Sequence, residues 1–211
     1  MQLKLGFLAS HGGSSMLAIL DAIAQKSIDA TAGLVISNNP DSKALSIASR
    51  YGVPNYHLSQ SKLGTLADLD EVILATLIDH GAEIVILSGY MRKLGHKTLS
   101  CYQGRILNIH PSLLPKFGGK GMYGMAVHEA VIRSGENESG ASVHIVDKEY
   151  DTGAVLLQSK VSVLAEDTAV DLARRVRSIE PDLFFETLKA ISSGAIKLPS
   201  VQSVSKNHRT E

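Results

Sequence analysis

The chain has 211 residues, of which 44% are hydrophobic and 20% charged, the balance of an ordinary folded domain with a substantial core. Lysine plus arginine number 21 and so do aspartate plus glutamate, so no basic excess favours nucleic acid as a partner. No apolar run reaches membrane-spanning length, and the single cysteine, Cys101, excludes an internal disulfide. We therefore expect a cytoplasmic protein with neither a membrane nor a nucleic-acid partner.

Short apolar runs alternate with helical patterns through the first half of the chain. The predicted strands cover 3–9, 31–37, 53–58, 84–88 and 105–110. The predicted helices cover 16–26, a segment capped by Asp41 that ends at Arg50, and 66–80. Strands that alternate with helices at this spacing predict an α/β fold, with a mostly parallel, twisted sheet and helices on both faces.

The rhythm changes in the second half, where two strand-like runs follow each other. A helix is predicted at 125–133, strands at 139–146 and 154–163, and a long helix at 168–192. The two consecutive strands predict an antiparallel edge near the C-terminal part of the sheet. Pro181 should bend the long helix or interrupt it. We expect one domain over 1–198 and a polar, frayed tail over 199–211.

A Gly/Ser turn separates the first strand from the first helix. Gly12 and Gly13 allow a tight turn, which leaves main-chain N–H groups and the hydroxyls of Ser14 and Ser15 at a helix N-terminus. This arrangement predicts an anion site, above all for phosphate. The turn matches neither a Walker A loop nor GxGxxG, so dinucleotide binding is disfavoured. A turn capped by serine for structural reasons alone is the alternative.

The polar residues Asn108 and His110 interrupt an apolar run. They are two positions apart, so a strand would place both side chains on one face. Pro111 lacks an N–H group and should end that strand. An amide and an imidazole would then lie at the carboxyl end of a strand, where open α/β sheets bind ligands. Two hydrogen-bonded polar residues without a function are the plainer interpretation.

Asp151 begins an Asp-Thr-Gly sequence between two apolar runs, which on its own is ordinary turn chemistry. A histidine base needs an acidic partner to hold its tautomer, and a loop carboxylate at the same sheet end would supply one. Asn108 could donate to an oxygen that gains negative charge. These three groups suit acyl-type transfer, and because no activated serine or cysteine accompanies them, direct transfer between two bound substrates is favoured. The histidines show no convincing metal spacing, and His128 and His144 are expected to be structural or solvated, so we predict no metal.

The motif NIHPSLLP, residues 108–115, followed by DTG at 151–153, resembles the 10-formyltetrahydrofolate-dependent formyltransferase family. The resemblance covers the chain from the first strand to the long C-terminal helix. It implies a Rossmann-like formyltransferase fold, with 10-formyltetrahydrofolate as a cosubstrate and no metal. Because the chain ends near 200 residues and has the Gly/Ser turn, the resemblance further implies formyl transfer to the amine of glycinamide ribonucleotide in de novo purine synthesis. A homodimer is left open.

The resemblance also assigns individual residues. It implies that Asn108, His110 and Asp151 are catalytic. Five residues are assigned to the ribonucleotide: Gly13, Ser14, Ser15, Pro111 and Glu180, the last as an acid that meets the substrate amine. Six are assigned to the folate: Met91, Arg92, Lys93, Leu94, Asn108 and Val146.

Three departures from the family pattern bear on the choice of substrate. Ser15 replaces a common asparagine, Leu66 occupies the position of a basic residue, and a Gly-rich stretch containing Lys120 replaces the commoner Pro-Gly version. Hydrolysis of the same folate and formyl transfer to another amine are alternative activities. A non-catalytic module that binds a phosphorylated ligand is the alternative from another class.

Overall fold

A computed structural model of the chain describes residues 2–199, and the predicted tail beyond Pro199 lies outside them. The strands are β1 (Leu3–Ala9), β2 (Ala30–Ser37), β3 (Asn55–His57), β4 (Ile84–Leu87), β5 (Ile106–His110), β6 (Glu138–Ile145) and β7 (Val155–Ser162). The helices are α1 (Ser14–Ala24), α2 (Lys43–Arg50), α3 (Gln60–Leu63), α4 (Leu66–Asp79), α5 (His96–Cys101), α6 (Met125–Ser134) and α7 (Ala169–Ser192). None of the helices within 2–199 is long and apolar enough to cross a membrane.

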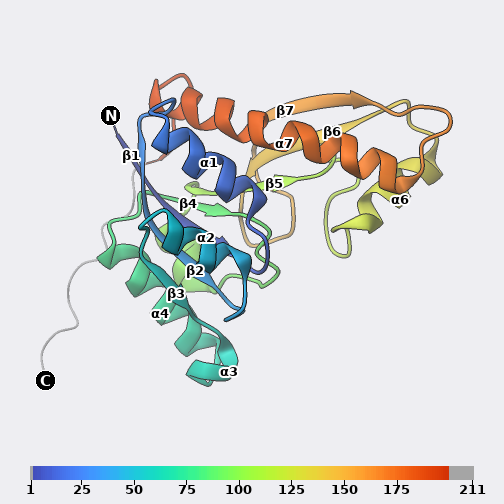
Figure 1. Ribbon diagram of the computed structural model, residues 1–211. Helices are drawn as coiled ribbons and strands as arrows, with labels where there is room; N and C mark the ends of the chain where they lie inside the picture. The colour runs from blue at the N-terminus through green and yellow to red at the C-terminus, as the bar shows by residue number, and fades with distance from the viewer. Residues whose placement is uncertain (1, 200–211) are drawn as a thin grey trace, which may run out of the picture.

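The strands form one sheet in the order β3-β2-β1-β4-β5-β6-β7 (Figure 1). The strands from β3 to β5 pair in parallel, whereas β6 runs antiparallel to β5 and β7 antiparallel to β6. The predicted mostly parallel sheet with an antiparallel edge is confirmed. In the β5–β6 register, Asn108 lies opposite His144 and His110 opposite Ser142. Both pairs therefore share one face of the sheet, because side chains alternate along each strand.

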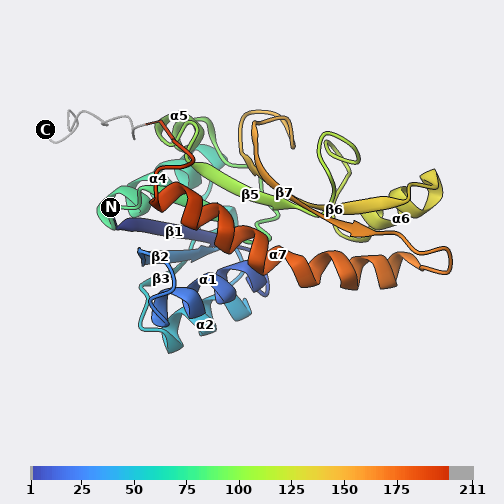
Figure 2. The same cartoon turned by 90° about the horizontal axis from the view of Figure 1, so that it is seen from above.

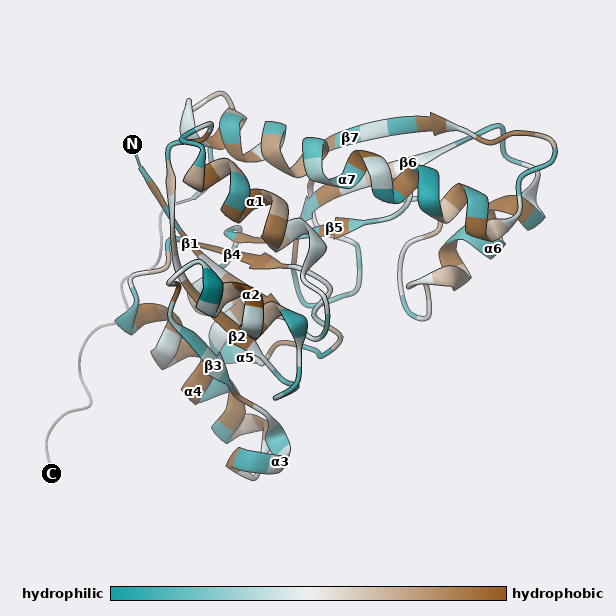
Figure 3. Ribbon diagram, viewed as in Figure 1, coloured by the Kyte–Doolittle hydropathy of each residue, from teal (hydrophilic) through white to brown (hydrophobic). Residues whose placement is uncertain are grey.

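Helices cover both faces of the sheet, as predicted. Figure 2 shows α4 and α5 on one side, with α1 and α2 on the other. One apolar cluster joins the sheet to α1, α2 and α7, and a second joins it to α4 and α5. The central strand β4 is buried along its whole length and coloured as hydrophobic in Figure 3. Each fully buried leucine or isoleucine in these clusters stabilises the fold by about 1.5–3 kcal/mol.

Local signals set the helix ends, with one correction to the prediction. Ser42, not Asp41, caps α2, because its side chain accepts from the Leu45 N–H. Pro181 does not interrupt α7, which runs unbroken from Ala169 to Ser192 beside α1 (Figure 1). Buried side chains on both sides of the proline pack this helix against the sheet, and that packing outweighs the missing hydrogen bond. The short helices α3 and α5 were not predicted.

The sheet has a topological switch point between β1 and β4. Chain connections leave these neighbouring strands in opposite directions along the sheet, β1 toward β2 and β4 toward β5. The Met16 N–H donates to Ser88 Oγ at 3.0 Å, which joins the start of α1 to the end of β4. Ligands of open α/β sheets bind in the crevice beyond such strand ends. The Gly/Ser turn and the segment after β4 both lie at this place.

Candidate functional site

The structure brings Asn108, His110 and Asp151 together. The two strand residues project from the same face of β5, and the loop between β6 and β7 folds back over that face. Asp151 Oδ2 lies 3.4 Å from His110 Nδ1, and the two side chains are only 12% and 5% exposed. Such a buried pair can hold a proton between imidazole and carboxylate, which is the arrangement that acid–base chemistry needs.

The Asp-Thr-Gly turn is built to deliver this carboxylate. Asp151 has a φ of +58°, in the left-handed region that aspartate tolerates better than most residues. A Cβ on Gly153 would lie 2.0 Å from the Ile145 carbonyl oxygen, so no larger residue fits there. The Thr152 hydroxyl donates to Asp147 Oδ1 at 2.9 Å and closes the loop on itself. The sequence is both a turn and the support of a site residue.

His144 belongs to the same group and is not solvated, which excludes one of the two expectations for it. Its side chain is buried, and its Nε2 lies 3.1 Å from Asn108 Nδ2 and 3.6 Å from Asp151 Oδ1. Its Nδ1 donates to the Ile145 carbonyl at 2.9 Å, so Nε2 carries the lone pair and accepts from the Asn108 amide. The polar position within an apolar strand was visible in the sequence, but its partner on β5 was not.

Electrostatics keep this histidine an acceptor. Burial lowers the pKa of His144, although its hydrogen bond to the Ile145 carbonyl and the charge of Asp151 oppose the shift. A neutral imidazole at this place orients the Asn108 amide, since one amide N–H is used by His144. The second N–H of Asn108 remains for a ligand oxygen.

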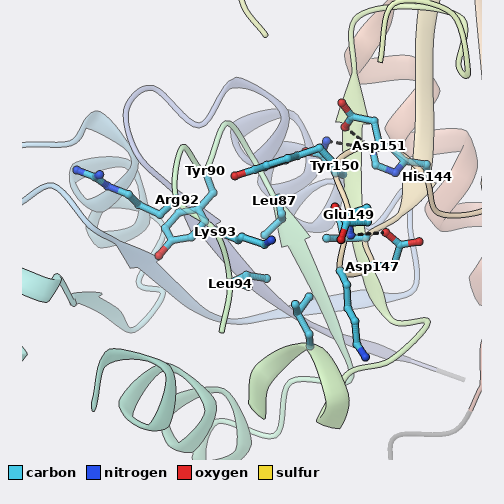
Figure 4. A pocket seen from close by; sticks show the side chains of 14 residues that line it. Leu87, Tyr90, Arg92, Lys93, Leu94, His144, Asp147, Glu149, Tyr150 and Asp151 are labelled. Carbon is cyan, nitrogen blue, oxygen red and sulfur yellow. Dashed lines mark hydrogen bonds and ion pairs between the residues drawn. The ribbon is translucent and has the colours of Figure 1, made fainter. Parts of the chain in front are cut away.

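A pocket opens beside this group, between the segment after β4 and the β6–β7 loop. Figure 4 shows His144 and Asp151 at one end of it, with Arg92 on the far side. Burial raises the pKa of Tyr90 to about 12, so this wall carries a neutral phenol. The pocket is lined by Leu87, Tyr90, Arg92, Lys93, Leu94, Leu99, Asn108, His144, Val146 and residues 147–151. Five of the six predicted folate residues line it.

Met91 is the sixth, and the structure places it differently. Its side chain is 53% exposed and does not line the pocket, while its main-chain N–H donates to Ser10 Oγ at 2.7 Å. The hydroxyl of Ser10 in turn donates to Asn38 Oδ1 at 2.6 Å. Met91 therefore joins the pocket wall to the Gly/Ser turn through its main chain. A folate contact by its side chain stays a prediction.

The Gly/Ser turn has the conformation that its glycine requires. Gly13 has a φ of +62° and caps α1, and Leu17 N–H makes the first helical bond to its carbonyl. The N–H groups of Ser14 and Ser15 lie before that bond at the helix end, whereas that of Met16 is taken by Ser88 Oγ. The Ser14 side chain is exposed and that of Ser15 is buried. This end can hold an anion, although Ser15 would contribute through its main chain.

None of the five residues predicted to bind the ribonucleotide lines the pocket, and two of them also lie away from the Gly/Ser turn. Pro111 directly follows His110 and is partly buried. Glu180 lies in the middle of α7, and burial raises its pKa to about 7, opposed by the charge of Arg177. No hydrogen bond or ion pair within 2–199 joins Glu180 to the catalytic group, so its role toward a substrate amine stays a prediction.

Other reactive groups offer little chemistry. Cys101 is buried, and burial raises the pKa of its thiol, which disfavours the nucleophilic thiolate. Across residues 2–199, no group of three or more His, Cys, Asp or Glu side chains is arranged to hold a metal ion.

Comparison with known proteins now decides the family. The model of the formyl transferase family matches residues 3–188. The chain belongs to the formyl transferase family. This formyl transferase is 37% identical to the chloroplastic phosphoribosylglycinamide formyltransferase of Arabidopsis thaliana over 92% of this chain and 67% of the relative. It is 35% identical to that of Escherichia coli over 90% of this chain and 88% of the relative. The structure of glycinamide ribonucleotide transformylase 1 from Symbiobacterium toebii superposes with a TM-score of 0.85 and 31% identity over 95% of both chains.

Proposed function

We propose that this chain transfers the formyl group of 10-formyltetrahydrofolate to the primary amine of glycinamide ribonucleotide, a step of de novo purine synthesis. The convergence of Asn108, His110 and Asp151 beside a pocket carries the proposal. The names of the Arabidopsis and Escherichia coli relatives support formyl transfer to phosphoribosylglycinamide. Assembly as a homodimer, a cytoplasmic location and one domain over 1–198 stay predictions from the sequence.

The reaction needs a hydrogen-bond donor to the formyl oxygen. As the amine nitrogen attacks the formyl carbon, the carbonyl oxygen becomes an oxyanion of a tetrahedral intermediate. The second amide N–H of Asn108 is free to donate to it, because His144 holds the first. A donor already oriented toward developing charge stabilises a transition state more than water does, since it need not reorganise.

The reaction also moves a proton. The attacking amine loses one, and the folate nitrogen takes one when its bond to the formyl carbon breaks. Asp151 Oδ2 and His110 Nδ1 are close enough to share a proton and pass it between these two nitrogens. The pair therefore acts first as a base and then as an acid, and no covalent enzyme intermediate is required.

The pocket suits the folate. Leu87, Leu94 and Val146 give apolar walls for a flat heterocycle, and Arg92 lies at the rim where a glutamate carboxylate would extend. The phosphate of the ribonucleotide would bind at the Gly13 turn, which follows β1, two strands from β5 in the sheet. The two substrates would then meet at Asn108 and His110.

An absorbance assay of folate turnover, run with and without glycinamide ribonucleotide, tests the proposal. Formation of tetrahydrofolate only when the amine is present supports transfer. Turnover without the amine would instead assign the chain as a hydrolase. No turnover, together with phosphate-ligand binding at the Gly13 turn, would favour the binding module.

A further inference from the structure

The segment Phe117–Gly119 contacts both members of the catalytic pair through its main chain. The His110 Nε2–H donates to the Phe117 carbonyl at 2.7 Å, and the Gly119 N–H donates to Asp151 Oδ2 at 2.9 Å. A carbonyl only accepts, so Nε2 must carry a hydrogen. In the neutral ring the lone pair therefore lies on Nδ1, which is the nitrogen that faces Asp151.

We propose that Phe117 is a positioning residue for His110: the Phe117 main-chain carbonyl selects the Nε2–H tautomer and so directs the Nδ1 lone pair to Asp151. This inference rests on the proposed function and deepens it. Beside Asp151, it adds a second contact to the His110 side chain, which neither a side-chain pattern nor the family motif marks.

The local fold aims this carbonyl at the ring. Phe117 has a φ of +55°, which is uncommon for a residue other than glycine and turns its carbonyl in a direction that a right-handed conformation does not reach. A Cβ on Gly118 would lie 2.5 Å from Leu114 Cδ2 and 3.2 Å from Asp151 Cβ. The loop therefore packs directly against the acidic partner, and Gly118 permits that approach.

The start of the loop is anchored to the antiparallel strands. Ser142 on β6 accepts from the Leu114 N–H at 3.0 Å and donates to the Ser112 carbonyl at 2.6 Å. Gln158 on β7 donates to the Leu114 carbonyl at 3.0 Å. The Ser112 hydroxyl donates to the Lys116 carbonyl at 2.6 Å, one residue before Phe117. This chain of hydrogen bonds holds the segment that carries the Phe117 carbonyl.

The consequence for the chemistry follows from the two nitrogens. If the ring loses its Nε2 partner, both tautomers and a ring flip become available, and Nδ1 faces Asp151 as an acceptor only part of the time. A histidine with the proton on the other nitrogen cannot take a proton through Nδ1. Loss of the carbonyl should therefore lower kcat while leaving the binding surfaces for both substrates in place.

Two substitutions distinguish the effect of the Phe117 main-chain carbonyl from the effect of its phenyl ring. Phe117→Val and Phe117→Asn both remove the ring, but a β-branched residue strongly disfavours a positive φ whereas asparagine tolerates it. We expect Phe117→Val to lower kcat by about 10- to 100-fold, the scale of a small misplacement of a catalytic group. Phe117→Asn should retain kcat within about threefold of the wild type, and KM for both substrates should change little in either variant.

Imidazole ¹⁵N NMR of histidine-labelled protein gives a readout that packing alone would not move. The His110 ring, assigned by its loss in His110→Gln, should show the Nε2–H tautomer in the wild type and in Phe117→Asn, and a mixture in Phe117→Val. Melting curves check that all variants are folded. Equal losses of kcat in the two Phe117 variants with an unchanged tautomer would overturn the inference and leave only ring packing. Absence of formyl transfer by the wild type would overturn the proposed function, while the tautomer comparison would still decide the role of Phe117.

Discussion

The charge of Asp151 should account for a large part of the rate. Asp151→Asn keeps the shape of the side chain, tolerates the φ of +58° and can still accept from Gly119, so it removes the charge almost alone. Two unit charges 3.4 Å apart interact by about 5 kcal/mol at an effective dielectric constant of about 20. Half of that energy, for a proton only partly transferred in the transition state, corresponds to a loss of kcat on the order of 10²-fold.

The assay is kcat from folate absorbance at saturating concentrations of both substrates. Asp147→Asn is the matched control for kcat alone: this carboxylate also lines the pocket and closes the same loop, but the bonds it accepts within 2–199 come from the Glu149 N–H and the Thr152 hydroxyl, not from His110, and asparagine can still accept them. It should lower kcat by no more than about threefold, as expected for a group that makes no transition-state contact. His110→Ala should be comparably severe to Asp151→Asn, and the double variant little worse, since groups that act as a unit are not additive. Additive losses of kcat in the Asp151–His110 double variant, or equal losses in Asp147→Asn and Asp151→Asn, would refute the shared-proton mechanism.

Three further predictions follow from other parts of the structure. Gly13→Val should raise KM for the ribonucleotide and barely change KM for folate, because Gly13 has a φ of +62° and the new Cβ would lie 3.1 Å from Met16. Gly12→Val is the control, because a Cβ on Gly12 would meet no atom within 4 Å. Equal effects of the two substitutions on KM would contradict the reasoning. A folate analogue should protect 90–94 and 146–151 from hydrogen exchange and leave 10–15 unprotected; protection confined to 10–15 would exclude the pocket as the folate site. Burial raises the pKa of Glu180 from 4.5 to about 7, so between these pH values the folded chain binds more protons than the unfolded chain and its stability falls as pH rises. Glu180→Gln should therefore raise Tm more at pH 8 than at pH 5. An equal shift of Tm at both pH values would be inconsistent with a buried carboxyl group.

The parallel half of the fold was predictable from the sequence because its strands and helices follow from local patterns of apolar residues. Fully apolar runs such as β4 and the proline after His110 mark strands and their ends without any knowledge of the partner. Ser42 rather than its neighbour Asp41 caps α2, and local propensity does not distinguish two adjacent residues that can both cap a helix. The helix α7 continues through Pro181 because residues on both sides of the proline are buried, and this tertiary effect cannot be read from local sequence.

The site was predictable only where residues of one segment meet. Asn108 and His110 share a strand face by spacing alone. His144 lies opposite Asn108 because of the β5–β6 register, and register depends on long-range pairing. The contribution of Phe117 comes from its main-chain carbonyl, and every residue has one, so nothing in the side-chain pattern could mark it.

The register between β5 and β6 also limits how this chain can change in length. β5 pairs in parallel with β4 on one edge and antiparallel with β6 on the other, so neither strand can slide independently. Inserting one residue between Ser142 and His144 would turn His144 to the opposite face, away from Asn108, while leaving a strand that still pairs. Insertions and deletions are therefore compatible with activity in loops that carry no site residue and excluded from these two strands.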